Sequence, residues 1–295
     1  MTPPIPPDDA LAALLPPDVD LDPAAPVGLR HEAALPVWHG LVWSRLGRGD
    51  LAWEQWGRVH LPELQPWIAA ERGRVLRELG LHAAAEAVEW PALLQAEDAV
   101  DAAMLRVSLA ADAVGHGDLA GARRRLAAAE QAVGALAADG RDGHDGPRAA
   151  RQRLRLAWVR VEVAALGGDP LPTGGLPVWD ERTGGPVQPA DARHGSRFHA
   201  AKGLLFGGVA RGDARLLEAA AALAPPVIAW AVQLARADLG GDPDAEAAAR
   251  EAWRRIVPPP AVAAEVAATA IAHRLGRPEA AATLDHDVSG TSRGC

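Results

Sequence analysis

The chain has 295 residues and a formal net charge of −8, with 49% hydrophobic and 23% charged residues. This composition predicts a globular protein with a true core, and the acidic balance excludes nucleic acid as the expected bulk partner. Cys295 is the only cysteine, which excludes an intrachain disulfide and any zinc site built on several cysteines.

Residue usage indicates the genome and the compartment. The chain has no tyrosine, no asparagine and one lysine, Lys202, all residue types with AT-rich codons. We therefore expect a bacterial protein from a genome of high GC content. The first residues lack the basic and apolar segments of a signal peptide, and Pro225-Pro226 interrupts the apolar stretch 219–235. We expect a cytoplasmic protein without a membrane span.

Residues 1–30 differ in composition from the rest of the chain. They hold eight prolines and five aspartates against one arginine, which predicts an acidic leader that is extended or disordered. From His31 onward the chain is rich in alanine, and glycine and proline leave segments of helical length between them. We therefore expect an all-α fold after the leader.

Residues 31–138 contain three stretches with the same internal spacing. In each, a small residue is followed seven positions later by glycine and twelve positions later by alanine. The small pairs are Gly40 and Ala52, Gly73 and Ala85, and Ala110 and Ala122, and the glycines between them are Gly47, Gly80 and Gly117. Small residues let two antiparallel helices approach closely, and glycine allows the left-handed turn between them. The spacing predicts three helical hairpins.

This spacing resembles the tetratricopeptide repeat (TPR), a helix-turn-helix of about 34 residues. Gly40-x2-Trp43, Ala52-x3-Trp56 and Ala122-x3-Leu126 are similar to elements of its motif, whereas Glu89 stands where an apolar residue is expected. The match is strongest over residues 32–137. The resemblance implies a right-handed α-solenoid of about six to seven antiparallel helical hairpins, whose first helices line a concave binding groove.

The second half of the chain continues this organisation after an interruption. Residues 139–196 are predicted to hold a glycine-rich loop, a basic helix over 148–166 and a long irregular segment over 167–196. Residues 197–288 are predicted to form further hairpins, and 289–295 a flexible tail. Several hairpins turn at a Gly-Asp step, where glycine ends one helix and aspartate caps the next. These steps are Gly49-Asp50, Gly117-Asp118, Gly212-Asp213 and Gly241-Asp242.

The sequence carries no motif for nucleophilic or nucleotide-dependent catalysis, and we predict no cofactor and no metal site. Our first hypothesis is a non-enzymatic scaffold that binds a protein or peptide. The TPR resemblance places the binding residues on first helices, outside the small-residue seam. They are Arg45, Trp67, Arg74 and Arg77. Arginine favours an acidic or carboxylate-bearing partner, because guanidinium binds carboxylate through two hydrogen bonds.

Two alternatives stay open. A ligand-sensing or enzymatic protein would form its pocket between the solenoid and the 167–196 segment, using His194 and His199. A nucleic-acid adaptor would use the basic stretch 123–160, where Arg148, Arg151 and Arg155 share one helix face. That face is otherwise a solvated surface, or a site for the acidic leader.

Overall fold

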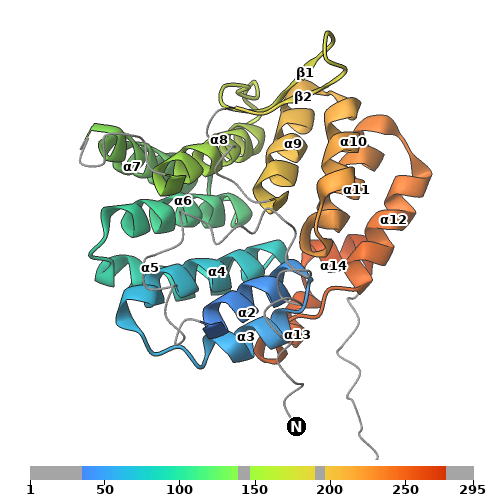
Figure 1. Cartoon of the computed structure of the whole chain (residues 1–295). Coiled ribbons are helices and arrows are strands. Elements are labelled where there is room, and N and C mark those ends of the chain that lie inside the picture. Colours follow the sequence, from blue (N-terminus) through green and yellow to red (C-terminus); the bar gives the residue numbers. More distant parts are fainter. Residues whose placement is uncertain (1–34, 139–146, 190–196, 277–295) are drawn as a thin grey trace, which may run out of the picture.

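The computed structural model describes residues 35–138, 147–189 and 197–276, most of which are helical (Figure 1). The first helices are α2 (Leu35–Arg45), α3 (Gly49–Trp56), η3 (Pro62–Leu64), α4 (Gln65–Glu78), α5 (His82–Gln95), α6 (Ala99–Gly115), α7 (Leu119–Ala138) and α8 (Pro147–Gly167). The later helices are α9 (Arg197–Arg211), α10 (Ala214–Leu223), α11 (Pro226–Gly240), α12 (Pro243–Arg254), η5 (Pro260–Val262), α13 (Ala263–Val266) and α14 (Ala270–Leu275). The predicted leader and tail lie outside the described residues.

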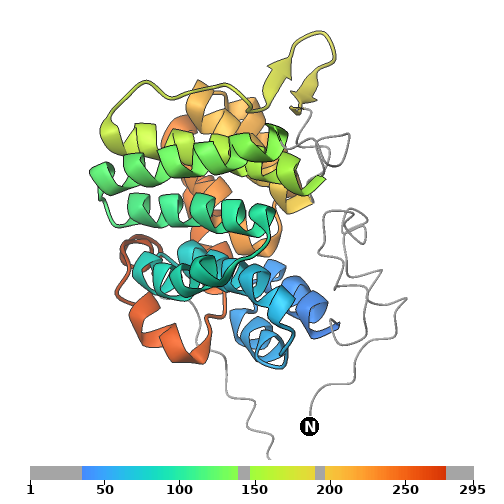
Figure 2. The ribbon, with the colours of Figure 1, turned by 90° about the vertical axis from the view of Figure 1, so that its left-hand side faces the viewer.

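The three predicted hairpins are present as α2–α3, α4–α5 and α6–α7, stacked in successive layers (Figure 2). The turn glycines Gly47, Gly80 and Gly117 have φ values of 80°, 80° and 72°, in the left-handed region that favours glycine. The alanines of the second helices are completely buried. They are Ala52, Ala85 and Ala122. The small-residue spacing therefore marks the seams between paired helices.

Two of the small residues make room for one large partner each. A Cβ atom at Gly40 would lie 2.3 Å from Nε1 of Trp56, and one at Gly73 would lie 2.0 Å from Oε1 of Glu89. Trp56 and Glu89 occupy equivalent places in their hairpins, four residues after the buried alanine. A carboxylate thus takes the position that an aromatic ring fills in the preceding hairpin.

Gly-Asp steps connect helices at three of the predicted places. Gly117, Gly212 and Gly241 have positive φ, and each following aspartate accepts a hydrogen bond from a backbone N–H group at the start of the next helix. The prediction for Gly49-Asp50 is wrong. Gly47 makes that turn, and Asp50 instead accepts hydrogen bonds from the Arg48 guanidinium.

The helices form a closed arrangement in the described residues. The inner helices α2, α4, α6, α8, α9 and α11 each pack on the next, and α11 packs back on α2. In Figure 1, α2 to α8 rise on one side and α9 to α12 descend on the other. The two ends join through backbone hydrogen bonds of 2.8 Å, from Gly49 N–H to Val257 O and from Val257 N–H to Gly47 O. In the described residues, this contact joins the inner helices into a ring, in place of the expected open stack of hairpins.

The largest apolar cluster among the described residues contains residues from both the first and the last described helices. Trp56 and Leu76 from the first hairpins share it with Trp253, Ile256 and Leu275 from the last described helices. All five side chains are at most 4% exposed. Burial of this size stabilises by about 1.5–3 kcal/mol for each large apolar side chain. The join between the ends is therefore part of the core.

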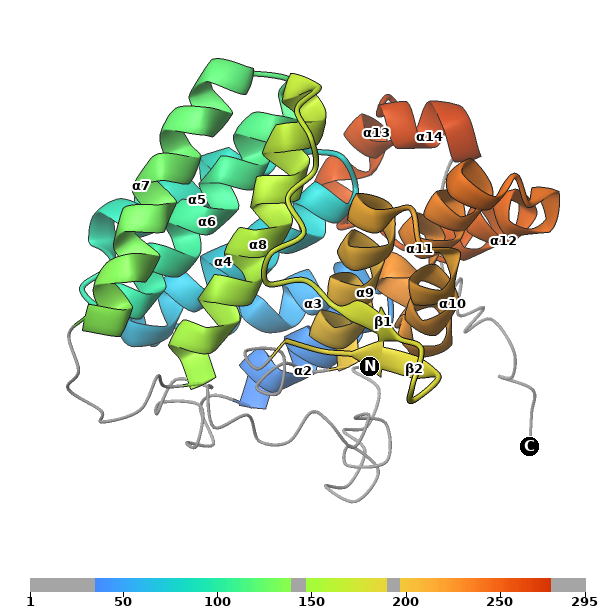
Figure 3. The same cartoon turned by 90° about the horizontal axis from the view of Figure 1, so that it is seen from above.

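The segment 167–196 is not irregular throughout, because it contains the antiparallel strands β1 (Val178–Asp180) and β2 (Gly185–Val187). Figure 3 shows this hairpin lying over α9 and α10. Arg211 donates hydrogen bonds to the carbonyl oxygens of Pro177 and Thr173, and the Arg215 guanidinium lies 5.1 Å from the Trp179 ring. No described helix is long and apolar enough to cross a bilayer.

Candidate binding cavity

A cavity of about 650 Å³ lies between the six inner helices, and each of them contributes lining residues. Sites for small molecules usually measure about 300–1,000 Å³. All seven arginine and tryptophan residues that the sequence singles out line this one cavity. They are Arg45, Trp67, Arg74, Arg77, Arg148, Arg151 and Arg155. The structure therefore brings together two sets of residues that the sequence assigns to separate surfaces.

Arg74 is already held by carboxylates of its own helix. Its Nε lies 2.8 Å from Glu71 Oε2 and its Nη1 lies 2.6 Å from Glu78 Oε2, while Nη2 donates to Ser44 Oγ at 2.7 Å. The side chain is 9% exposed. Against the effect of burial, Glu78 and Glu71 raise the pKa of Arg74. Arg74 is thus an anchored part of the cavity wall, and its guanidinium is not open for a partner as the TPR resemblance implies.

Arg77 bridges two buried carboxylates behind the cavity surface. Its Nη1 lies 2.8 Å from Glu89 Oε2 and 3.2 Å from Asp112 Oδ2, and both carboxylates are completely buried. Burial, with the neighbouring Asp112, raises the pKa of Glu89 to about 8 in spite of Arg77. The Arg77 guanidinium therefore interacts with two acids of the protein and, like Arg74, is held within the protein.

The predicted basic face of α8 points inward. Arg155 donates to Gln152 Oε1 at 3.0 Å and to Ser108 Oγ at 2.7 Å, and both acceptors are neutral. Arg148 lies 2.5 Å from Asp101 Oδ1 on α6. Since these side chains line the cavity together with Arg151, the prediction of an exposed basic surface on this helix is wrong.

Arg45 is the least compensated arginine of the opposite wall. Its nearest carboxylate atom, Glu71 Oε2, is 3.8 Å away, and the Phe198 ring lies 3.8 Å from its Cζ. Burial, followed by repulsion from Arg74, lowers the pKa of Arg45 to about 9. Burial and repulsion from Arg77 similarly lower the pKa of Arg155 to about 10. Both guanidinium groups remain charged at neutral pH at a cost in free energy.

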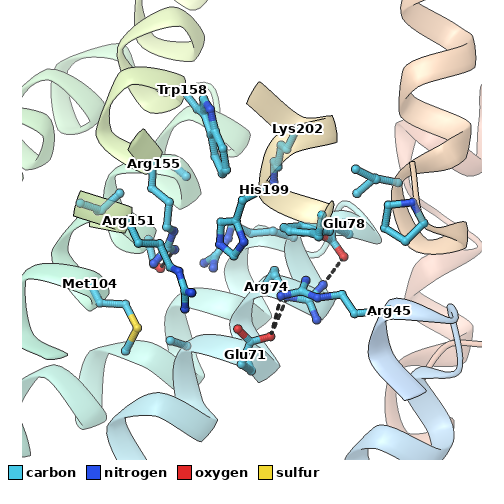
Figure 4. Close-up of a pocket in the computed structure, with 18 of the residues that line it drawn as sticks. Arg45, Glu71, Arg74, Glu78, Met104, Arg151, Arg155, Trp158, His199 and Lys202 are labelled. Atoms are coloured by element: carbon cyan, nitrogen blue, oxygen red, sulfur yellow. Dashed lines mark hydrogen bonds and ion pairs between the residues drawn. The ribbon is translucent and has the colours of Figure 1, made fainter. Parts of the chain in front are cut away.

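His199 lies at the centre of this group, between Arg151 and Arg155 on one side and Arg74 and Arg45 on the other (Figure 4). It is 8% exposed, and its ring stacks on Trp158 with centroids 6.0 Å apart. Burial, and then the surrounding cations, lower the pKa of His199 well below its usual value. The imidazole is therefore neutral at pH 7. His194, its predicted companion, lies outside the described residues.

Aromatic and apolar side chains form much of the remaining wall. Trp158 stacks on Phe206 with centroids 5.9 Å apart and an interplanar angle of 11°. Trp67, Met104 and Trp230 also line the cavity. An apolar surface next to charged groups is suited to a ligand with two kinds of surface.

Sequence reasoning missed several residues of the cavity. Glu71, Arg74 and Glu78 follow an i, i+3, i+7 spacing, which places a carboxylate on either side of an arginine along one helix face. Lys202 shares a helix face with Phe198, at i and i+4, and its Nζ lies 5.6 Å from that ring. Both spacings are visible in the sequence. The combination of α2, α4, α8 and α9 into one wall is not, because these helices are far apart in the chain.

The described part of the 167–196 segment, residues 167–189, contributes no lining residue. His199, one of the two histidines assigned to the predicted pocket, lines the cavity, and residues 190–196 lie outside the described residues. Within the described ranges, no group of three or more histidine, cysteine, aspartate or glutamate side chains is placed to hold a metal ion. The sequence matches no protein-family model, and comparison with curated proteins and with solved structures gives no match.

Proposed function

We propose that the protein binds an anionic small molecule in its central cavity and acts as a binding or ligand-sensing protein. The observation that supports this most is the combination of size and charge in one place. Eight arginine and lysine side chains and three carboxylates line a cavity of about 650 Å³. The basic residues are Arg45, Arg74, Arg77, Arg148, Arg151, Arg155, Arg197 and Lys202, and the acids are Glu71, Glu78 and Glu162.

The charge of the cavity lining is opposite in sign to the net charge of the whole chain. The formal net charge is −8, whereas basic side chains outnumber carboxylates in the cavity lining, even with Arg77 and Arg148 paired to acids behind it. Low-dielectric walls strengthen the interaction of such groups with a bound charge. An anion that enters gains this interaction, and a cation of similar shape loses it.

Anilinonaphthalene sulfonate, a fluorescent aromatic anion, tests the proposal. We expect saturable binding to the full chain at one site. The variant Ala111→Trp fills the cavity from α6 and should abolish this binding, whereas Ala248→Trp on the exposed face of α12 should leave it intact. Equal binding by wild type and Ala111→Trp, with both proteins folded by circular dichroism, would refute a cavity site.

A protein- or peptide-binding scaffold of TPR-like type is the second candidate. The turn glycines and the buried alanines of the first three hairpins support the TPR resemblance. Since the first helices of the hairpins enclose the cavity, we propose that such a partner inserts an acidic chain end. A fluorescein-labelled peptide with an acidic C-terminus, compared with its C-terminal amide, tests this version. Equal affinity for the two peptides would refute the insertion of an acidic chain end into the cavity.

The nucleic-acid alternative loses the support of Arg148, Arg151 and Arg155, which line the cavity, and keeps only the exposed Arg123, Arg124 and Arg160 of the basic stretch. We propose a non-enzymatic role in the cytoplasm, as the sequence predicts. A buried neutral histidine beside arginines is the arrangement that an enzymatic role would have to use, so turnover of any ligand that binds is the direct check.

A further inference from the structure

The single lysine of the chain lies in the cavity. Arginine stands at 29 of the 30 lysine and arginine positions, and the exception, Lys202 on α9, lines the cavity (Figure 4). A guanidinium keeps its proton at neutral pH, whereas an ε-amine can lose its proton and act as a nucleophile. We infer that Lys202 forms a covalent imine with an aromatic aldehyde bound in the cavity. This inference rests on the proposed function, because it names the reactive class of ligand at the same site.

Two aromatic rings flank the Lys202 amine. Its Nζ lies 5.7 Å from the centroid of the Trp158 ring and 5.6 Å from that of the Phe198 ring. Phe206, one helical turn further along α9, stacks on Trp158 with centroids 5.9 Å apart. In the part of the chain that the structure describes, Nζ makes no hydrogen bond and no ion pair. The amine therefore lies beside apolar surface, without an acceptor that would hold its proton in place.

Burial has the largest effect on the charge of this amine. It lowers the pKa of Lys202 and outweighs the attraction of Glu78 and Glu162. Repulsion from Arg77 and Arg74 lowers the pKa further. Both ring distances are close to the 6 Å limit of a cation–π contact, so the rings stabilise the ammonium only weakly. At a given pH, a larger fraction of Lys202 than of an exposed lysine is therefore the neutral, nucleophilic amine.

Imine formation at Lys202 balances without a further reactant. The amine nitrogen attacks the carbonyl carbon, and the electrons of the C=O π bond move to the oxygen, which takes one proton from the nitrogen. The carbinolamine then loses its oxygen as water together with the second amine proton, and the nitrogen lone pair forms the C=N bond. An imine is a weaker base than an amine. The reaction therefore also removes a positive charge that Arg77 and Arg74 repel.

The cavity lining favours an aldehyde with an aromatic body. The rings of Trp158 and Phe206 stack with an interplanar angle of 11°, next to the Lys202 amine, and Trp67 and Met104 also line the cavity. Aromatic groups gain by stacking on such rings and by leaving water. About 650 Å³ is enough for an aromatic ring with an anionic substituent, which the basic lining of the proposed function favours.

Reductive trapping of the full chain tests this inference. 4-Formylbenzoate, an anionic aromatic aldehyde, is added with cyanoborohydride at pH 7, and peptide mass spectrometry locates the adducts over time. The matched reference is the variant Arg160→Lys, which adds one ε-amine on the exposed side of α8, where Arg160 pairs with Glu130 and does not line the cavity. We expect Lys202 to react about tenfold faster than the amine at position 160, or more, because the cavity raises the local concentration of the aldehyde.

A second variant links this reactivity to the cavity. Ala111→Trp, added to Arg160→Lys, fills the cavity and should slow the modification of Lys202 while the rate at position 160 stays the same. Ala248→Trp on the exposed face of α12 should change neither rate. Circular dichroism shows that each variant is folded. The two amines in one chain share every other condition, so the ratio of their rates reports the effect of the cavity alone.

The outcomes separate this inference from the proposed function. Equal rates at the two positions, or a faster rate at position 160, would overturn the inference. If anilinonaphthalene sulfonate still binds wild type and not Ala111→Trp, the cavity binds an anion and only the covalent step is wrong. Fast modification of Lys202 that Ala111→Trp does not slow would also overturn the inference. If anilinonaphthalene sulfonate binds wild type and Ala111→Trp alike, the proposed function itself fails, and the inference fails with it.

Discussion

Arg77 on α4 and Glu89 on α5 form an ion pair with an Nη1–Oε2 distance of 2.8 Å, and the Glu89 carboxylate is completely buried. Arg77 also pairs with the buried Asp112, whose pKa is lowered, so removing Arg77 leaves the Asp112 charge uncompensated. We expect Arg77→Met to reduce the free energy of unfolding by about 3–5 kcal/mol. Urea denaturation followed by circular dichroism measures this.

Two further variants test that interpretation. Adding Asp112→Asn to Arg77→Met should restore part of the loss, because the buried charge that Arg77 compensates is then removed. Arg58→Met is the surface control: Arg58 pairs with Glu54 in solvent, so its loss should change stability by less than about 1 kcal/mol. A small loss in Arg77→Met, similar to that in Arg58→Met, would show that the buried pair does not stabilise the fold.

The raised pKa of Glu89 also predicts that the stability of the protein depends on pH. Its pKa is raised from 4.5 to about 8 in the folded protein, so the folded state binds more protons than the unfolded state between these values. The contribution of Glu89 to stability is therefore complete below about pH 4.5 and is lost as the pH rises to about 8. Asp112 does not oppose this there, because its lowered pKa acts only at lower pH.

The comparison with Glu89→Gln isolates this contribution. His199, whose pKa is lowered, contributes the opposite slope below its usual value, and Glu162, whose pKa is raised, contributes the same sign as Glu89. Both are present in wild type and variant. The difference in unfolding free energy, wild type minus variant, should fall between pH 5 and pH 8. A flat difference would mean that Glu89 is ionised throughout.

Substitution of Arg45 should have the opposite effect on thermal stability to that of a usual core substitution. Its charge is buried, Arg74 repels it, and its closest carboxylate contact is 3.8 Å long. In the absence of ligand, Arg45→Met should leave the melting temperature unchanged or raise it, because an apolar side chain of similar length avoids the cost of a buried charge. Differential scanning calorimetry checks this, and a clear fall in melting temperature would show that Arg45 stabilises the empty protein.

The join between residues 47–49 and Val257 predicts a local effect on amide exchange. Ile256 is 4% exposed, and its Cδ1 lies 2.9 Å from the position that a Cβ atom at Gly47 would take. Ile256→Ala should cost about 2–4 kcal/mol and increase amide hydrogen exchange in α2 and α3. Leu217→Ala on α10 is a matched control whose side chain packs on Gly208 instead. If Ile256→Ala and Leu217→Ala increased exchange in α2 and α3 equally, the join would have no specific effect on the stability of the first hairpin.

The sequence predicts local features of this fold well, because they depend on neighbouring residues. The left-handed glycines Gly47, Gly80 and Gly117 and the capping aspartates Asp213 and Asp242 are visible in short stretches. The join of Gly49 with Val257 is not, because it depends on the summed angles of all the hairpins between them. The same holds for the cavity. Its arginines are identifiable as a residue type, but their common location depends on the join.

Glu89 shows how a departure from a pattern carries information. The TPR resemblance expects an apolar residue at this position, and the structure buries a carboxylate there between Arg77 and Asp112. The sequence alone does not identify its partners, which lie 12 residues before it and 23 residues after it. The departure nevertheless marks a hairpin with buried polar groups in its interior.

The join between residues 47–49 and Val257 also limits how this chain can change in evolution. An open stack of helical repeats gains or loses a unit at little cost, because each unit contacts only its neighbours. Here an added or deleted hairpin would separate the two ends by the width of a whole unit and expose the apolar cluster that they share. We therefore expect homologous chains to vary in their turns and outer helices while keeping the same number of inner helices.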